Sequence, residues 1–135
     1  MSEEPASDVG PQQLDAVLSY LPIFTQPGYT FGEWVRNEGQ FPWFAMNRDA
    51  EAFIVALYEQ NLIFPFDWGN WRAEAQRLMA DPDDLANADL LTLRKLLVTH
   101  VRADRFNEGH LASVFENGHI TAILNRLKAI RETME

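Results

Sequence analysis

Apolar residues recur every three or four positions along most of the chain, which is the spacing of one face of an α-helix. The clearest series follows Asp89, a good N-cap residue, and predicts a helix that ends near Arg105. An earlier series opens at Pro11, and Pro22 is expected to end it. The apolar positions of these two series and of a third, C-terminal one are Leu90, Leu93, Leu96, Leu97 and Val101; Leu14, Val17, Leu18 and Leu21; and Ile120, Ile123, Leu124, Leu127 and Ile130.

Shorter helices are expected between these three. Each begins after a residue whose side chain can accept a hydrogen bond from the first turn. Asn117 and Gly118 would close the last of them with a left-handed residue. The expected segments are 48–60 after Asn47 or Asp49, 68–80 after Asp67, a single turn after Asp81 or Asp83, and 107–115 from Asn107.

Residues 28–46 do not follow the helical spacing. Their order fits an extended chain, in which successive side chains point to opposite sides. The polar residues 37–40 separate two aromatic runs, so the segment predicts a β-hairpin with its turn there. Pro42 confines the second run to an edge or irregular strand. Two strands alone are marginally stable, so the hairpin is expected to lie against the helices.

Aromatic residues gather on this hairpin and around the start of the helix at 68. We expect them to form the core that holds the hairpin in place. The alternative is that part of the set lines a groove for a peptide or a planar ligand. The set is Trp34, Trp43, Phe44, Phe64, Phe66, Trp68 and Trp71.

These patterns predict a mainly α protein, a single domain over residues 11–135 with five or six helices and one small β-hairpin. Residues 1–10 are acidic and polar and are expected to form a disordered tail. No internal repeat and no linker divides the rest.

The composition narrows the class of function. The chain has 11 Lys and Arg against 20 Asp and Glu, a net charge of −9, which argues against direct binding to nucleic acids or anionic membranes. Without cysteine it has no disulfide, thiolate nucleophile or cysteine-bound zinc. The N-terminal residues do not resemble a signal peptide, and no segment approaches the roughly 20 apolar residues of a membrane span. We therefore expect a cytoplasmic protein.

Charged residues cluster where the helix after Asp89 ends. At about 100° per residue, Asp104 falls near the line of its apolar stripe, and His100 lies one turn before it. Arginine would supply paired donors to a phosphate or carboxylate, histidine a proton near neutral pH, and the next helix its N-terminal N–H groups. Glu108 argues against such a site, because its charge could occupy the place of the anion. The candidate ligand-binding residues are Arg102, Asp104, Arg105, Glu108 and His110.

Other roles fit the same segment. Arg102 and Arg105 could pair with Asp104, Glu108 or Glu116 and lock a helix–helix corner. A metal site from His100, Asp104 and His110 is weakly indicated, because the three histidines are ten and nine residues apart and no two share a helical face. Ser113 lacks the strand–turn–helix elbow of a nucleophile. We expect no metal and no cofactor.

Three stretches carry a resemblance: VLSYLPIF at 17–24, residues 41–71, and residues 88–118. Over about residues 14–130 the chain resembles an uncharacterised bacterial family, a domain of unknown function. The motif RADRFNEGHLA at 102–112 marks the family. The resemblance implies no activity, since the family has no assigned catalytic residue or ligand. The polar tail at 1–10 departs from the family pattern.

The leading functional prediction is a small soluble binding or regulatory protein without catalytic activity, with a protein or a small anionic ligand as partner. A first alternative is a small enzyme or ligand sensor for a phosphate- or carboxylate-bearing substrate. There Arg102 and Arg105 would clamp the anion, His110 would act as acid or base, and Asp104 or Glu108 would orient it. A second alternative is an acidic inhibitor of a basic, nucleic-acid-binding protein.

Overall fold

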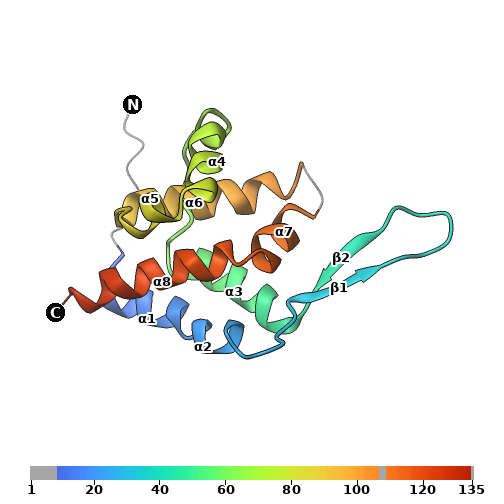
Figure 1. Ribbon diagram of the computed structural model, residues 1–135, viewed down its shortest axis with the longest axis horizontal. Coiled ribbons are helices and arrows are strands. Elements are labelled where there is room, and N and C mark those ends of the chain that lie inside the picture. The colour runs from blue at the N-terminus through green and yellow to red at the C-terminus, as the bar shows by residue number, and fades with distance from the viewer. Residues whose placement is uncertain (1–8, 107–108, 135) are drawn as a thin grey trace.

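The computed structural model describes residues 9–106 and 109–134 and is mainly helical, with one two-stranded antiparallel hairpin (Figure 1). The predicted fold class is confirmed at this level. The elements are α1 (Pro11–Leu18), α2 (Leu21–Phe24), β1 (Gly32–Val35), β2 (Trp43–Met46), α3 (Arg48–Glu59), the 3₁₀ helix η1 (Trp68–Trp71), α4 (Arg72–Ala80), α5 (Pro82–Ala86), α6 (Leu90–Ala103), α7 (His110–Glu116) and α8 (His119–Glu132).

The expected count of five or six helices is too low, and the short helix α2 was not expected at all. The chain turns at Ser19 and Tyr20 and starts again as α2, so Pro22 lies in the first turn of a new helix. A proline costs no intrahelical hydrogen bond there, and Pro82 takes the same kind of position in α5. The prediction that Pro22 ends the first helix is therefore wrong.

Three of the expected N-caps are confirmed. The Asn47 side chain accepts from Ala50 N at 2.8 Å, and the Asp89 side chain accepts from Thr92 N at 2.8 Å. Asp81 caps α5.

Two other expected caps turn out differently. Asp67 does not cap a helix: its carboxylate accepts from the Asn70 side chain, and the chain runs through η1 before α4 begins. Asn107 lies outside the described residues. Gly109, at φ 88°, directly precedes α7, and Gly118, at φ 86°, is left-handed as expected.

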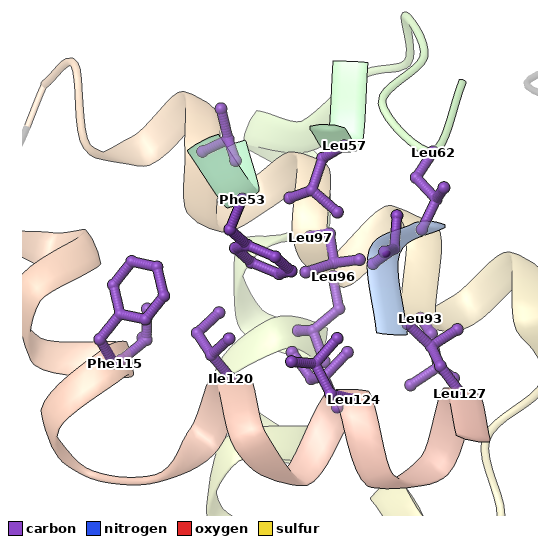
Figure 2. Close-up of a cluster of buried hydrophobic side chains, with 14 of the residues drawn as sticks. Phe53, Leu57, Leu62, Leu93, Leu96, Leu97, Phe115, Ile120, Leu124 and Leu127 are labelled. Atoms are coloured by element: carbon purple, nitrogen blue, oxygen red, sulfur yellow. The ribbon is translucent and has the colours of Figure 1, made fainter. Parts of the chain in front are cut away.

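The core lies where the apolar faces of α1, α3, α6 and α8 meet. Figure 2 shows Phe53 of α3 above a row of leucine and isoleucine side chains from α6 and α8. Val9 is 6% exposed, so the core begins before α1. The predicted apolar stripes of α6 and α8 are confirmed as core faces, and the largest fully buried side chains are Phe53, Phe115, Leu14, Leu57, Leu62, Leu93, Leu96, Leu97, Ile120, Ile123, Leu124 and Leu127.

The hairpin is anchored to this core at its base and projects away from the helices (Figure 1). Strand β1 pairs with β2 from Gly32↔Met46 to Val35↔Trp43. Phe31, next to the base, stacks on Phe115 of α7 with ring centroids 4.8 Å apart. The turn at 37–40 is confirmed by Gln40 N donating to Asn37 O at 3.0 Å.

The expectation that the hairpin aromatics form core is wrong for the two tryptophans. Trp34 and Trp43 are 45% and 43% exposed, and Phe41 at the tip is 90% exposed. No helix covers the outer half of the hairpin (Figure 1). Trp34 touches the helical body at Gly109, where an added Cβ would lie 2.9 Å from its ring.

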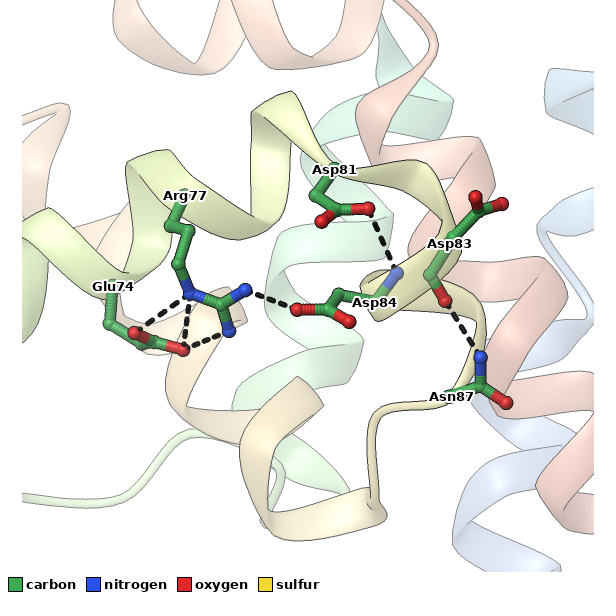
Figure 3. A network of polar contacts seen from close by, with 6 residues as sticks. All are labelled: Glu74, Arg77, Asp81, Asp83, Asp84 and Asn87. Carbon is green, nitrogen blue, oxygen red and sulfur yellow. Dashed lines mark hydrogen bonds and ion pairs between the residues drawn. The ribbon is translucent and has the colours of Figure 1, made fainter.

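Arginine side chains hold several helix junctions. Arg94 of α6 is 3% exposed and donates to the Asn61 and Leu62 carbonyls just after α3. Arg131 of α8 pairs with Asp15 of α1 at 2.8 Å. Figure 3 shows Arg77 of α4 bonded to carboxylates on α4 and α5. Within the described ranges, no helix is long and apolar enough to cross a membrane.

Candidate functional site

Three histidine rings meet at the corner of α6, α7 and α8, and they are all the histidines of the chain. His100 lies near the end of α6, while His110 and His119 are the first residues of α7 and α8. His100 Nδ1 is 2.9 Å from His110 Nε2. The His119 ring stands edge-on to the His100 ring, with centroids 4.9 Å apart. The chain changes direction between α6 and α7 and again between α7 and α8. The three histidines, which are too far apart in sequence to meet on one helix, therefore come together.

Burial favours the uncharged form of these rings. His100 is 1% exposed and His119 7% exposed, and the Nε2 atom of each is buried without a hydrogen-bond partner among the described residues. Burial, together with the neighbouring histidines, lowers the pKa of His100 well below 6.5. Burial also lowers the pKa of His119, to about 4, and that of His110, where the Asp104 carboxylate opposes the shift.

The contact between His100 and His110 fixes how the pair shares protons. Between two neutral rings one nitrogen must donate and the other accept, so the two tautomers are set together. If His110 takes up a proton, its Nε2–H donates to His100 Nδ1, which stabilises the imidazolium. His110 is the more exposed member of the pair and therefore its acid–base end.

The pair borders a cavity of about 470 Å³, here called the histidine pocket. Its walls come from η1, α4, α6 and the start of α7. Apolar side chains form most of the lining, with Arg72, Gln76 and the two histidines as its main polar groups. The lining residues are Trp68, Arg72, Ala75, Gln76, Met79, Thr99, His100, Ala103, Phe106 and His110.

A second cavity of about 380 Å³, the arginine pocket, lies on the neighbouring face of α6. The two pockets share one wall, formed by Trp68 and Phe106, whose rings stack with centroids 5.8 Å apart and planes 28° apart. The lining residues of the arginine pocket are Phe64, Pro65, Phe66, Trp68, Val98, Arg102, Arg105 and Phe106.

The two pockets differ in charge from the molecule as a whole. Arg72, Arg102 and Arg105 line them, and no Asp or Glu of residues 9–106 and 109–134 does. Across those same ranges, none of these three arginines forms an ion pair or a side-chain hydrogen bond. In a chain of net charge −9, three arginines thus line one region that holds no Asp or Glu from the described ranges.

The structure distributes the predicted site residues over two places. Arg102 and Arg105 face the arginine pocket, whereas His110 faces the histidine pocket beyond the Trp68–Phe106 wall. Asp104 Oδ1 accepts from Leu111 N at 3.0 Å, so a carboxylate already occupies the first turn of α7. Glu108 lies outside the described residues.

The polar contacts of this segment differ from the expected ion pairs. His100 bonds to His110, and Asp104, one turn along the same helix, bonds to Leu111 N. In the described chain, neither Arg102 nor Arg105 pairs with Asp104 or Glu116, so the expected ion-pair lock is not formed with these partners.

Sequence reasoning missed Arg72, Gln76 and Phe106 as pocket residues. Arg72 and Gln76 are one turn apart on α4, but an exposed i,i+4 pair carries no functional signal by itself. Phe106 lies inside the RADRFNEGHLA segment, and only its exposure, 80%, distinguishes it from a core residue. Of the residues that the structure describes, no group of three or more His, Asp or Glu is arranged to hold a metal ion.

Comparison with known proteins adds a family but no function. The model of a family of unknown function (DUF6508) matches residues 9–133. No curated protein and no solved structure matches the chain.

Proposed function

The chain belongs to the DUF6508 family, whose function is unknown, and we propose from its own geometry that it binds a small anionic ligand in the joined histidine and arginine pockets. This proposal agrees with the leading prediction of a binding protein but changes the residues of the site. Arg102, Arg105 and His110 remain, and the other residues of the histidine pocket, including those on α4, are added.

One observation carries the proposal: three arginines line two adjoining pockets, and the described residues supply neither an ion-pair partner to these arginines nor a carboxylate to either pocket. The chain has 20 carboxylate side chains and 11 cationic ones, so pockets lined by arginines and by no described carboxylate are unexpected unless they bind an anion. Arginine binds phosphate and carboxylate groups through paired hydrogen bonds, and a concave apolar wall strengthens such contacts.

The size and lining of the pockets fit a small molecule. Ligand pockets typically span about 300–1,000 Å³ and combine apolar walls with a few polar groups. The histidine pocket, at about 470 Å³, has this composition.

Acid–base catalysis on the bound ligand is a second candidate function, and the 2.9 Å contact between His100 and His110 favours it. His110 would accept a proton from the ligand while its Nε2–H donates to His100 Nδ1. This candidate requires the same bound anion, so binding is tested first.

The test is a thermal-shift titration of the full chain with inorganic phosphate, pyrophosphate, citrate and mononucleotides, at low and at high ionic strength. At least one anion should raise the melting temperature of the wild type, and high salt should weaken the effect. Arg105→Gln should remain folded, because the side chain is exposed, and should lose the shift.

The matched control is Arg36→Gln, which removes an exposed arginine on the hairpin, outside both pockets. It has the same formal charge change and should keep the shift. Stabilisation of Arg105→Gln and wild type by equal amounts, or no stabilisation by any anion, would overturn the proposal.

A further inference from the structure

Resting on the proposed function, we infer the class of its ligand: a planar ring joined to a phosphate group. The ring lies in the histidine pocket against the Trp68–Phe106 wall, and the phosphate lies in the arginine pocket. The two pockets differ in chemistry, and an aromatic wall separates them.

The arginine pocket is built for the charged end. Arg102 lies in the last turn of α6 and Arg105 in the turn that follows it, and both residues line the arginine pocket. Two guanidinium groups can present several N–H donors to the oxygens of one phosphate. Arg102 is half-buried and Arg105 exposed, which suits a strongly hydrated group that loses only part of its water.

The histidine pocket is built for a less charged body. Ala75, Met79 and Ala103 provide apolar surface, which a ring can cover. The Gln76 amide, His110 and Arg72 lie among them and can pair with ring nitrogen and oxygen atoms. A pocket that binds a heterocycle typically has apolar walls and a few hydrogen-bond donors and acceptors that fix the orientation of the ring.

The wall between the pockets supplies the stacking surface. Phe106 is 80% exposed, although it lies against Trp68. It follows α6 in a turn closed by its own N–H, which donates to Ala103 O at 3.0 Å, and this turn holds the ring at the boundary of the two pockets. A planar ligand ring would cover a large apolar group that the protein leaves in water.

The geometry of α6 connects the two ends of the ligand. Thr99 and Ala103, one turn apart, line the histidine pocket. Val98 and Arg102, one residue earlier in each case, line the arginine pocket. The two pockets therefore lie against adjacent faces of α6. A ligand that passes the edge of the Phe106 ring would occupy both pockets.

Isothermal titration of the full chain tests the inference with named probes. The probes are purine and pyrimidine mononucleotides, flavin mononucleotide and pyridoxal phosphate, each beside its dephosphorylated form and beside inorganic phosphate. At least one ring phosphate should bind at least about tenfold more tightly than both of its parts, since each part leaves one pocket empty.

Variants assign each end. Phe106→Ala should weaken the ring phosphate about tenfold and leave inorganic phosphate unchanged, whereas Phe41→Ala, which removes the exposed phenylalanine of the hairpin tip, should change neither. The double variant Arg102→Gln/Arg105→Gln should reduce the ring phosphate to the affinity of its dephosphorylated form.

The outcomes separate this inference from the proposed function. If anions bind but the ring adds nothing, or if Phe106→Ala and Phe41→Ala behave alike, the ligand class is wrong and anion binding stands. If neither a ring phosphate nor a simple anion binds, the ligand class and the proposed function are both overturned.

Discussion

His100 and His119 are buried, and in each the Nε2 atom has no hydrogen-bond partner among the described residues. A neutral ring tolerates this burial better than a charged one, which is why the pKa of His119 falls from 6.5 to about 4 and that of His100 falls also. Below about pH 6.5 these histidines therefore bind protons in the unfolded chain but not in the folded chain. Their contribution to the free energy of unfolding is fully present above that pH and is lost as the pH falls toward about 4.

We predict that the urea midpoint of the wild type decreases between about pH 7.5 and about pH 5.5. The three histidines of the cluster are the only ones in the chain, and most carboxylates titrate at lower pH, so this cluster should dominate the change. His119→Phe, which keeps an aromatic ring but cannot take up a proton, should lose less stability over the same interval. Equal midpoints of the wild type at both pH values would contradict the prediction.

The meeting of these histidines also marks a limit of sequence reasoning at the scale of residues. Spacings of ten and nine residues exclude a shared helical face, and that inference was correct for each helix. The rings meet because α7 and α8 fold back across the end of α6, and such reversals are set by packing between helices. The position of Asp104 was predicted near the buried face, but its partner, the Leu111 N–H, belongs to the next helix.

At the scale of elements, one buried arginine determines how the chain leaves α3. Arg94 of α6 donates to the Asn61 and Leu62 carbonyls, and its guanidinium lies 4.9 Å from the centre of the Phe64 ring. Asn61 has a left-handed backbone, at φ 64°, so the carbonyls after α3 turn out of the helix direction. They would be left without this charged donor if Arg94 were replaced.

Arg94→Met is expected to destabilise the protein by about 2–4 kcal/mol, because it leaves buried carbonyls without their donor. Arg77→Met is the matched control, since Arg77 also bonds two acceptors but its side chain is 48% exposed (Figure 3). Its loss should be clearly smaller. Urea unfolding of both variants measures the difference, and equal losses would mean that burial of Arg94 does not matter.

Element prediction from the sequence was reliable where a helix is long or has an acidic or amide cap. Helices α3, α6 and α8 and the caps Asn47 and Asp89 follow from local hydrogen bonding and from apolar residues at helical spacing. The hairpin and its turn were also predictable, but the exposure of Trp34 and Trp43 was not. Which residues of a strand are covered depends on what packs over it, and local sequence does not contain that information.

At the scale of the whole molecule, net charge and local charge have opposite signs. The composition correctly reports an acidic chain, yet three of its 11 cations, Arg72, Arg102 and Arg105, gather around Trp68 and Phe106. These residues come from α4, α6 and the segments next to them. Net charge thus describes the average surface of the protein, and the two pockets differ from that average.

The contact between α1 and α8 has a consequence for chain connectivity. Arg131 and Asp15 join these helices, and α8 ends beside the start of α1, far from the hairpin tip (Figure 1). A circular permutant with a short linker between residues 134 and 9, and new termini between Glu38 and Gly39, should therefore fold. Its circular dichroism spectrum should match that of the wild type, and a loss of helical signal would show that the closed hairpin is needed to assemble the helices. Such a permutant would place its free ends at the tip of the hairpin, so a fluorophore or a fusion partner could be attached there, remote from both pockets.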